Sequence, residues 1–391
     1  MVDPQIYPSC IFNEVVIMHE DCDISVVICT HNRSGMLSGA LESVLAQNIV
    51  DGRIKYEVIV VDNNSTDCTK EVVERYIAIG HSNLKYVFEG KQGVSYARNR
   101  GVANAQAPII AFTDDDVRVS KDWIAHIKAG FDAHPEIDFL GGKILPHWKS
   151  SPPAWLNRDH WWALALLDYG DEPFYVNSDN PLCLPTANAS FRKDLFEKFG
   201  QFSPEFSGRE DHEFLLRLWC EGVSGIYSPD VVVTAEVQPE RFRRDYHRKW
   251  NTTTGRFNST MRLNEIMGPD GRIVGEAPDA LTLFGVPLFI YRSLVAGGFG
   301  LVTATLRGQH AAALRHKNGL WYLIGYIQNR YQQNSLKRSY SGISEIRTFV
   351  KALVRKKLTG GRRSTATASG QKASGSEGVI ETQSTRRGIA E

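Results

Sequence analysis

The chain has 391 residues, of which 45 are Lys or Arg and 44 are Asp or Glu, so its net charge is +1. Hydrophobic residues make up 42% of it and charged residues 23%, as in ordinary globular proteins. This composition excludes a collagen, a wholly disordered chain and a polybasic nucleic-acid binder, so no nucleic-acid partner is expected. The six cysteines form no Cys-x-x-Cys pair, which argues against a disulfide scaffold and against a cysteine metal site.

Short apolar runs alternate with helical patterns in the first third of the chain. The runs that predict strands cover residues 24–29, 56–61, 84–88 and 108–113. Because parallel strands need helical crossovers, this alternation predicts an α/β fold with a mostly parallel, Rossmann-like sheet flanked by helices. Ligands of such sheets bind at the carboxyl ends of the strands.

The middle of the chain is less regular but carries further helix and strand patterns. We expect helices at 123–133 and 210–220, strands at 137–141 and 226–234, and a loop-like stretch rich in Pro and Trp at 144–162. Residues 240–250 are basic and predict one more helix, whose arginines could contact a diphosphate or simply face solvent.

Changes in composition predict four parts of the chain. These are an N-terminal extension at 1–23, an α/β domain at 24–260, a helical, membrane-associating region at 261–358 and a disordered tail at 359–391. The α/β domain would consist of two halves, 24–116 and 117–260. The tail is rich in Gly, Ser and Thr without periodicity, which is typical of disorder.

Residues 281–306 are apolar and contain a single charged residue, Arg292. The segment is long enough to cross a bilayer, but Pro287 and three glycines weaken a spanning helix. We therefore expect it to lie at the membrane interface, with a spanning helix and a buried helix as the alternatives. Because residues 1–23 show no secretory signal, we expect a cytoplasmic protein that is peripheral at the inner face of the cell membrane.

Polar clusters directly follow three of the predicted strands. They are Thr30-His31-Asn32-Arg33, Asp62-Asn63-Asn64-Ser65 and Asp114-Asp115-Asp116. In a parallel sheet all three lie along one edge, where the ligand crevice is expected. Each cluster taken alone is equally consistent with a helix cap or a turn.

The acidic triplet carries the strongest chemical information. Adjacent carboxylates raise one another's pKa values unless a cation compensates them. Asp114 and Asp116 offer hard oxygen ligands suited to Mg²⁺ or Mn²⁺ and to the phosphates that these ions bind. The chain has neither a Gly-rich dinucleotide loop nor a P-loop, so a metal ion is expected to neutralise a leaving nucleotide diphosphate. A solvated acidic turn is the alternative.

A second pair of carboxylates, Glu210 and Asp211, begins the helix predicted at 210–220. Acidic residues in a first turn interact favourably with the helix dipole, which alone could explain the pair. A carboxylate there is also a candidate general base, if it lies within hydrogen-bond reach of an acceptor hydroxyl. The sequence leaves both possibilities open.

Five ordered segments resemble glycosyltransferase family 2 over residues 24–235. They read VVICTHNRSGMLSGALESVLAQ, YEVIVVDNNSTD, GKQGVSYARNRGVANA, IIAFTDDDV and GREDHEFLLRL. The resemblance implies the GT-A fold and the inverting transfer of a sugar from a nucleotide-diphosphate sugar to an acceptor hydroxyl. It also implies Mn²⁺ or Mg²⁺ as the cofactor. By this resemblance 24–260 is the catalytic domain, with a nucleotide-binding half at 24–116 and an acceptor half at 117–260.

The resemblance further implies roles for individual residues. Asp211 would deprotonate the acceptor hydroxyl and Glu210 would support it, while Asp114 and Asp116 would bind the metal ion and the donor. The other donor contacts would come from Thr30, Asn32, Arg33, Asp62, Asn63, Arg98, Asn99 and Asp115.

The acceptor and the reaction class leave alternatives. The apolar 281–306 segment favours a polyprenyl-diphosphate-linked oligosaccharide as the acceptor, in cell-surface polysaccharide assembly, over a soluble glycan. A nucleotidyltransferase would also need carboxylates and a metal ion beside a parallel sheet. A non-catalytic protein of the same fold would bind a glycan or a nucleotide sugar without turnover.

Overall fold

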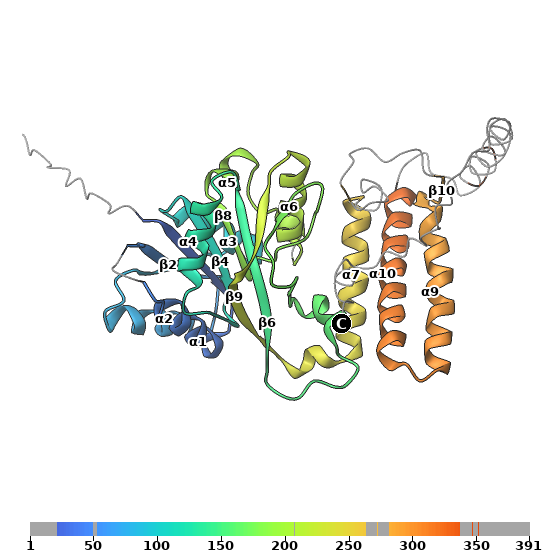
Figure 1. Ribbon diagram of the computed structural model, residues 1–391, viewed down its shortest axis with the longest axis horizontal. Coiled ribbons are helices and arrows are strands. Elements are labelled where there is room, and N and C mark those ends of the chain that lie inside the picture. Colours follow the sequence, from blue (N-terminus) through green and yellow to red (C-terminus); the bar gives the residue numbers. More distant parts are fainter. Residues whose placement is uncertain are drawn as a thin grey trace, which may run out of the picture.

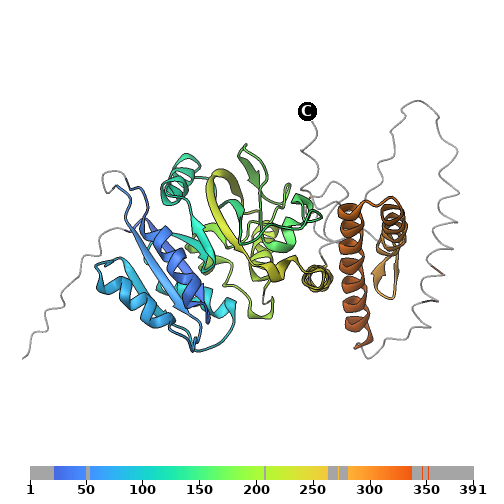
Figure 2. The ribbon, with the colours of Figure 1, turned by 90° about the horizontal axis from the view of Figure 1, so that it is seen from below.

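The computed structural model describes residues 22–49, 53–206, 208–262 and 281–336, together with residues 272, 346 and 351. The predicted disordered tail at 359–391 lies outside the described residues, as does most of the predicted N-terminal extension. Figure 1 shows a sheet covered by helices and, beside it, a row of long helices. Figure 2 shows the same arrangement from below, with α2 and the last helices at opposite ends of the molecule.

The first part of the sheet is parallel, as the sequence predicts. Its strands agree with the predicted ranges to within one residue and are β1 (Ile24–Thr30), β2 (Tyr56–Asp62), β3 (Leu84–Phe88) and β4 (Ile109–Asp114). They lie in the order β3-β2-β1-β4. The crossovers are the helices α1 (Ser34–Leu45), α2 (Thr69–Ala78) and α3 (Val94–Asn104).

The complete sheet is mixed, so the expectation of a mostly parallel sheet is wrong. The added strands are β5 (Val117–Val119), β6 (Phe139–Trp148), β7 (Phe174–Val176), β8 (Asn188–Arg192) and β9 (Gly225–Val237). Strand β8 runs antiparallel to β4 and β6, and β5 and β7 run antiparallel to β9. Helical crossovers impose parallel pairing, and they join neighbouring strands only in the first part of the chain.

The bounds of the later helices agree with the predicted ranges better than those of the later strands do. Helices α4 (Trp123–Ala133) and α6 (Glu210–Cys220) have the predicted bounds. The basic segment forms the 3₁₀ helix η4 (Pro239–Phe242) and then α7 (Arg244–Thr260). A short helix, α5 (Asp194–Lys198), and two more 3₁₀ turns, η2 (Arg158–Leu164) and η3 (Pro204–Phe206), complete this part.

Strand β6 is longer than predicted. The loop expected from Ile144 is wrong for its first five residues, because Ile144–Trp148 continues β6. This part pairs in parallel with β9 after a register shift between Gly142 and Lys143. Pairing with a distant strand has overridden the weak local preference for a strand.

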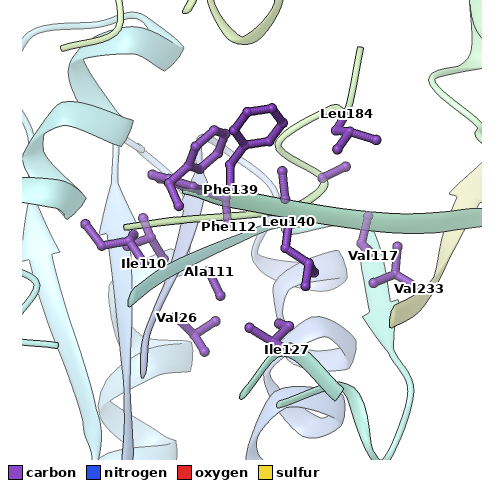
Figure 3. Close-up of a cluster of buried hydrophobic side chains, with 14 of the residues drawn as sticks. Val26, Ile110, Ala111, Phe112, Val117, Ile127, Phe139, Leu140, Leu184 and Val233 are labelled. Atoms are coloured by element: carbon purple, nitrogen blue, oxygen red, sulfur yellow. The ribbon is translucent and has the colours of Figure 1, made fainter. Parts of the chain in front are cut away.

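Aromatic side chains fix β4 at the centre of the core (Figure 3). Phe112 of β4 and Phe139 of β6 each lie with their ring centroid 6.1 Å from that of Phe191 on β8. All three rings are buried, and Ile127 of α4 is buried in the same core. A densely packed interior leaves little freedom to its strands, so the carboxyl end of β4 is held rigidly.

The C-terminal part consists of helices, as expected, and its association with a membrane stays a prediction. A two-stranded hairpin, β10 (Thr282–Leu283) and β11 (Val286–Pro287), precedes α9 (Leu288–Leu306) and α10 (His310–Ser335). Helix α10 lies between α7 and α9 (Figure 1). Among the described helices, α9 is the one that is long and apolar enough to cross a membrane.

Glycines allow α10 and α7 to approach closely. A Cβ atom at Gly255 of α7 would overlap the carbonyl oxygen of Tyr322, and one at Gly325 of α10 would overlap that of Thr252. Each backbone therefore packs directly against the other helix. This contact attaches the C-terminal helices to the catalytic domain.

Replacing Gly325 by Ala tests this contact. The added methyl group would overlap a backbone carbonyl, and overpacking of this kind costs about 1–3 kcal/mol. We expect a lower free energy of unfolding, measured in urea. Gly319→Ala is the control in the same helix, because its methyl group would enter open space. The better helix propensity of Ala would raise the free energy of unfolding of this variant by at most about 1 kcal/mol. Equal stabilities of the two variants would contradict the packing described here.

Candidate active site

The three polar clusters meet at one edge of the sheet, as the sequence predicts. Thr30 lies opposite Asp62 in the pairing of β1 with β2, and Cys29 lies opposite Asp114 in the pairing of β1 with β4. The three strands therefore end at the same level. Thr30 and Asp62 are buried at this edge, and Asp114 is partly exposed.

Hydrogen bonds connect the turn after β1 to the turn after β2. Asn32 and Asn64 have φ angles of 53° and 62°, in the left-handed region that Asn tolerates. The Asn32 backbone N–H donates to Ser65 Oγ over 2.9 Å, and Asn32 Oδ1 accepts from the Thr66 N–H over 2.7 Å. Asn32 thus holds the second turn in place beside the first.

Asp62 lies beside an open cavity of about 410 Å³. Its Oδ1 accepts from the Ser65 N–H over 2.9 Å, and its Oδ2 accepts from the Tyr86 hydroxyl over 2.7 Å. Burial and the Asp62 carboxylate raise the pKa of Tyr86, so its hydroxyl remains a donor. Phe88 forms another part of the wall. A cavity of this size suits a small ligand with an aromatic ring.

Asn63 and Asn99 bond to the backbone. Asn63 Nδ2 donates to the Lys91 carbonyl over 2.8 Å, and Asn63 Oδ1 accepts from the Gly93 N–H over 2.8 Å. The Asn99 side chain exchanges hydrogen bonds of 2.9 and 3.0 Å with the backbone of Phe202. The two residues position the loop before α3 and the segment before α6, and their expected contact with the donor stays a prediction.

The acidic triplet forms the turn between β4 and β5 and is flanked by arginines. Arg33 Nη1 lies 2.9 Å from Asp115 Oδ1 and 3.4 Å from Asp116 Oδ2. Arg241 Nη2, from η4, also lies 3.4 Å from Asp116 Oδ2. Burial, together with the charges of Asp114 and Asp115, raises the pKa of Asp116 to about 6. Burial also raises the pKa of Asp115, although the charge of Arg33 opposes this shift.

These residues fit a divalent cation that is shared with a diphosphate. Within the described ranges, no three His, Cys, Asp or Glu side chains form a metal site of their own. Asp114 and Asp116 would supply two carboxylates, which leaves the other coordination positions to water and phosphate oxygens. Mg²⁺ and Mn²⁺ commonly bind in this way, and a cation would offset the burial and the charge repulsion that raise the pKa of Asp116.

Arg98 of α3 connects the acidic triplet to the start of α6. Its buried guanidinium forms an ion pair with Glu210, and its Nη2 lies 3.5 Å from Asp114 Oδ1. Burial alone would lower the pKa of Arg98, but the carboxylates of Glu210 and Asp114 raise it above its ordinary value. Arg98 therefore stays charged and holds the two predicted carboxylate sites together.

Asp211 is the more accessible member of the pair that begins α6. It is partly exposed, whereas Glu210 is buried against Arg98. Asp211 Oδ1 accepts from the His212 N–H over 2.8 Å, and its Oδ2 lies 3.5 Å from the Thr186 N–H. Backbone donors thus orient a carboxylate that can still receive a proton.

Two neighbours of the site could not be identified individually from the sequence. Arg241 belonged only to a basic segment, and its contact with Asp116 joins residues 125 positions apart. Tyr86 lies within an ordinary strand pattern, and its hydroxyl meets Asp62 only because β3 pairs with β2.

A mixed α/β sheet with an acidic triplet at its edge and a second carboxylate pair beside it is the arrangement that the resemblance to a nucleotide-sugar glycosyltransferase predicts. Residues 25–200, a little under half of the chain, match the family model described as glycosyl transferase family 2. Over this region the chain belongs to glycosyltransferase family 2, with its GT-A fold.

Several known proteins are similar to this chain. The glucosyl-dolichyl phosphate glucuronosyltransferase of Haloferax volcanii is 26% identical over 190 residues, which cover 48% of this chain and 58% of that protein. The succinoglycan biosynthesis protein ExoM of Rhizobium meliloti is 26% identical over 232 residues, covering 57% of this chain and 70% of that protein. A solved mannosyltransferase from Pyrobaculum calidifontis, in complex with GDP-Man and Mn²⁺, shows 20% identity and a TM-score of 0.48, covering 88% of this chain and 83% of that one.

Replacing Asp116 by Asn should stabilise the metal-free protein. Folding raises the pKa of Asp116 from 3.8 to about 6, so ionising this group costs stability. This loss of stability is absent below the unfolded pKa of 3.8. It grows as the pH rises from 3.8 to the folded pKa of about 6, and it is complete above about pH 6. We expect a gain of about 1–3 kcal/mol near neutral pH and none near pH 4, from urea unfolding with EDTA.

Asp132→Asn is the control for this measurement. Asp132 is an exposed residue of α4 that pairs with Lys128, so its substitution should change stability equally little at both pH values. A gain for Asp116→Asn that is independent of pH would contradict the charge repulsion in the triplet.

Replacing Arg98 by Met should destabilise the fold strongly. The change leaves the Glu210 carboxylate buried without its cation, and breaking such a pair costs about 3–5 kcal/mol. Glu210→Gln in the same chain should recover part of this loss, since the buried charge is then removed. Urea unfolding of the two single variants and the double variant gives the interaction energy, and a value near zero would refute the coupling.

Proposed function

We propose that the protein is a metal-dependent, inverting hexosyltransferase. It would move a sugar from a nucleotide-diphosphate sugar to an acceptor hydroxyl. The observation that carries this proposal is the buried Arg98, which contacts Asp114 of the acidic triplet and Glu210 at the start of α6. Because one guanidinium reaches both, and the candidate base Asp211 directly follows Glu210, the donor carboxylates and the candidate base lie close together.

The donor would bind along the edge formed by β1, β2 and β4. Its nucleoside would occupy the cavity beside Asp62, and its diphosphate would lie at Asp114 and Asp116. Mn²⁺ or Mg²⁺ held by these two carboxylates would offset the charge of the leaving diphosphate. Arg33 and Arg241 orient the triplet through their contacts with Asp116.

The acceptor would be activated by Asp211. Its carboxylate is partly exposed and oriented by backbone N–H groups, so it can take the proton from an acceptor hydroxyl as the hydroxyl attacks. Glu210 stays paired with Arg98 and supports the start of α6. A single displacement of this kind inverts the configuration at the anomeric carbon and needs no covalent intermediate.

The acceptor class that we propose is a glycan on a polyprenyl phosphate or diphosphate, in cell-surface polysaccharide assembly at the cytoplasmic face of the membrane. Two similar proteins support this class by their names, one a glucosyl-dolichyl phosphate glucuronosyltransferase and the other a succinoglycan biosynthesis protein. The apolar helix α9 is a third support. Family membership favours sugar transfer over nucleotidyl transfer.

Nucleotide release by the purified chain tests the proposal. We expect release from one member of a panel of UDP-, GDP- and dTDP-sugars, with Mn²⁺ or Mg²⁺ and a lipid-linked acceptor, and its loss in EDTA. Asp211→Asn should lower kcat about 10²–10⁴-fold with little change in donor affinity, because it removes the base but no donor contact. Asp116→Asn should weaken binding of the donor and the metal ion instead.

The control for these two variants is again Asp132→Asn, which leaves the edge of the sheet intact and should keep the wild-type rate. Wild-type turnover by Asp211→Asn would show that the base has been misassigned. A donor that binds without any release would support a non-catalytic protein, and a product with retained anomeric configuration, seen by NMR, would exclude the single displacement.

A further inference from the structure

The outer side of helix α9 is apolar and exposed. Val295, Phe299, Val302 and Leu306 are 59%, 72%, 57% and 82% exposed. At about 100° per residue, these four side chains lie within an arc of about 60° on the helix. We call them the outer stripe. Soluble proteins rarely leave such an apolar surface without a partner.

The opposite side of α9 is already occupied by α10. Ile290 of α9 is buried in a small cluster with Leu323 and Tyr326 of α10. Further along, a side chain at Gly300 would overlap the ring of His316, so the two helices pack closely. The outer stripe therefore points away from α10. Helix α9 is the helix of the row that lies farthest from the sheet (Figure 1), so this outer side also faces away from the catalytic domain.

This packing argues against α9 as a membrane span. Helix α10 contacts α9 on one side and α7 on the other, and it carries Arg315, Lys317 and Arg330. If α9 crossed a bilayer in this arrangement, these charges would be drawn towards the hydrocarbon core, which is costly. An orientation along the membrane surface leaves them at the level of the headgroups.

Charge is divided unequally along the chain. Residues 1–280 contain 28 Lys or Arg and 40 Asp or Glu, a net charge of −12, whereas residues 281–363 contain 14 Lys or Arg and a single acidic residue, Glu345. The net charge of this second part is +13. The overall charge of +1 is therefore the sum of an acidic part and a basic part, 281–363, and the outer stripe lies in the basic part. Charge complementarity favours an anionic surface as its partner.

We propose that the outer stripe inserts into the headgroup region of an anionic lipid bilayer, with α9 lying along the surface. The apolar side chains would enter the boundary of the acyl chains, and Arg292 and Arg307, which lie in α9 and directly after it, would contact the lipid headgroups. A nucleic acid would satisfy the charge but offers no apolar phase to the stripe. A second copy of the same face would bring two strongly positive segments together.

Vesicle binding by the full-length protein tests this surface. We expect sedimentation with phosphatidylcholine vesicles that contain phosphatidylglycerol, weaker binding to phosphatidylcholine alone, and loss of the difference in high salt. The double variant Phe299→Ser/Leu306→Ser should bind about tenfold to a hundredfold more weakly, because it removes two large apolar side chains from the surface. Nucleotide release from a soluble donor should be unchanged in this variant, which separates this test from that of the proposed function.

The matched control is Ile79→Ser, since Ile79 is also 69% exposed but follows α2 at the other end of the molecule. This variant should bind vesicles like the wild type. Absence of vesicle binding, or equal binding by the stripe variant, would overturn the proposal. A dimer that the stripe variant abolishes would instead assign the stripe to a second copy. Retention in the membrane fraction after alkaline carbonate extraction would reject the surface orientation of α9.

Discussion

The contact on which the active site depends is the ion pair of Arg98 with Glu210, extended to Asp114. It joins α3 and the end of β4 to the start of α6, and Glu210 lies 112 residues after Arg98 in the sequence. A buried guanidinium needs carboxylates around it, and the buried Glu210 carboxylate needs a cation, so the elements hold one another in place. The acidic triplet and the carboxylate pair that begins α6 are thereby kept at a constant spacing.

The acidic triplet illustrates how function can conflict with stability. Asp116 lies beside two other carboxylates, and the two guanidinium groups that reach it leave its pKa raised. Such a site is less stable without its cation than a neutral one would be, and a bound cation with a diphosphate would remove the excess charge. The same burial and charge repulsion that cost stability would thus favour binding of a metal–nucleotide complex.

The molecule is divided electrically as well as structurally. Its catalytic domain is acidic, and its C-terminal helices and the residues that follow are basic, although the sum of the charges is close to zero. An acidic domain is repelled by an anionic membrane while the basic segment is attracted to it. This division would orient the protein at a bilayer with α9 towards the lipid and the catalytic domain away from the headgroups.

Local patterns in the sequence were sufficient for much of the fold and for part of the site. The first four strands, α4 and α6 follow from hydrophobic periodicity, and the edge shared by Thr30, Asp62 and Asp114 follows from the parallel connection of β1, β2 and β4. Periodicity reports which face of an element is buried, and the carboxyl ends of parallel strands must meet at one edge. The order of residues along the chain is therefore enough to bring the polar clusters that follow these strands together.

Only the tertiary structure decided the features that depend on distant partners. The extension of β6 arises from its pairing with β9, and the mixed sheet arises because the later helices do not connect strands that are neighbours in the sheet. The contacts of Arg98 with Glu210 and of Arg241 with Asp116 span 112 and 125 residues, so no periodicity can reveal them. The exposure of the outer stripe is of the same kind, because a helix with apolar residues on all sides does not itself determine which side its neighbours cover.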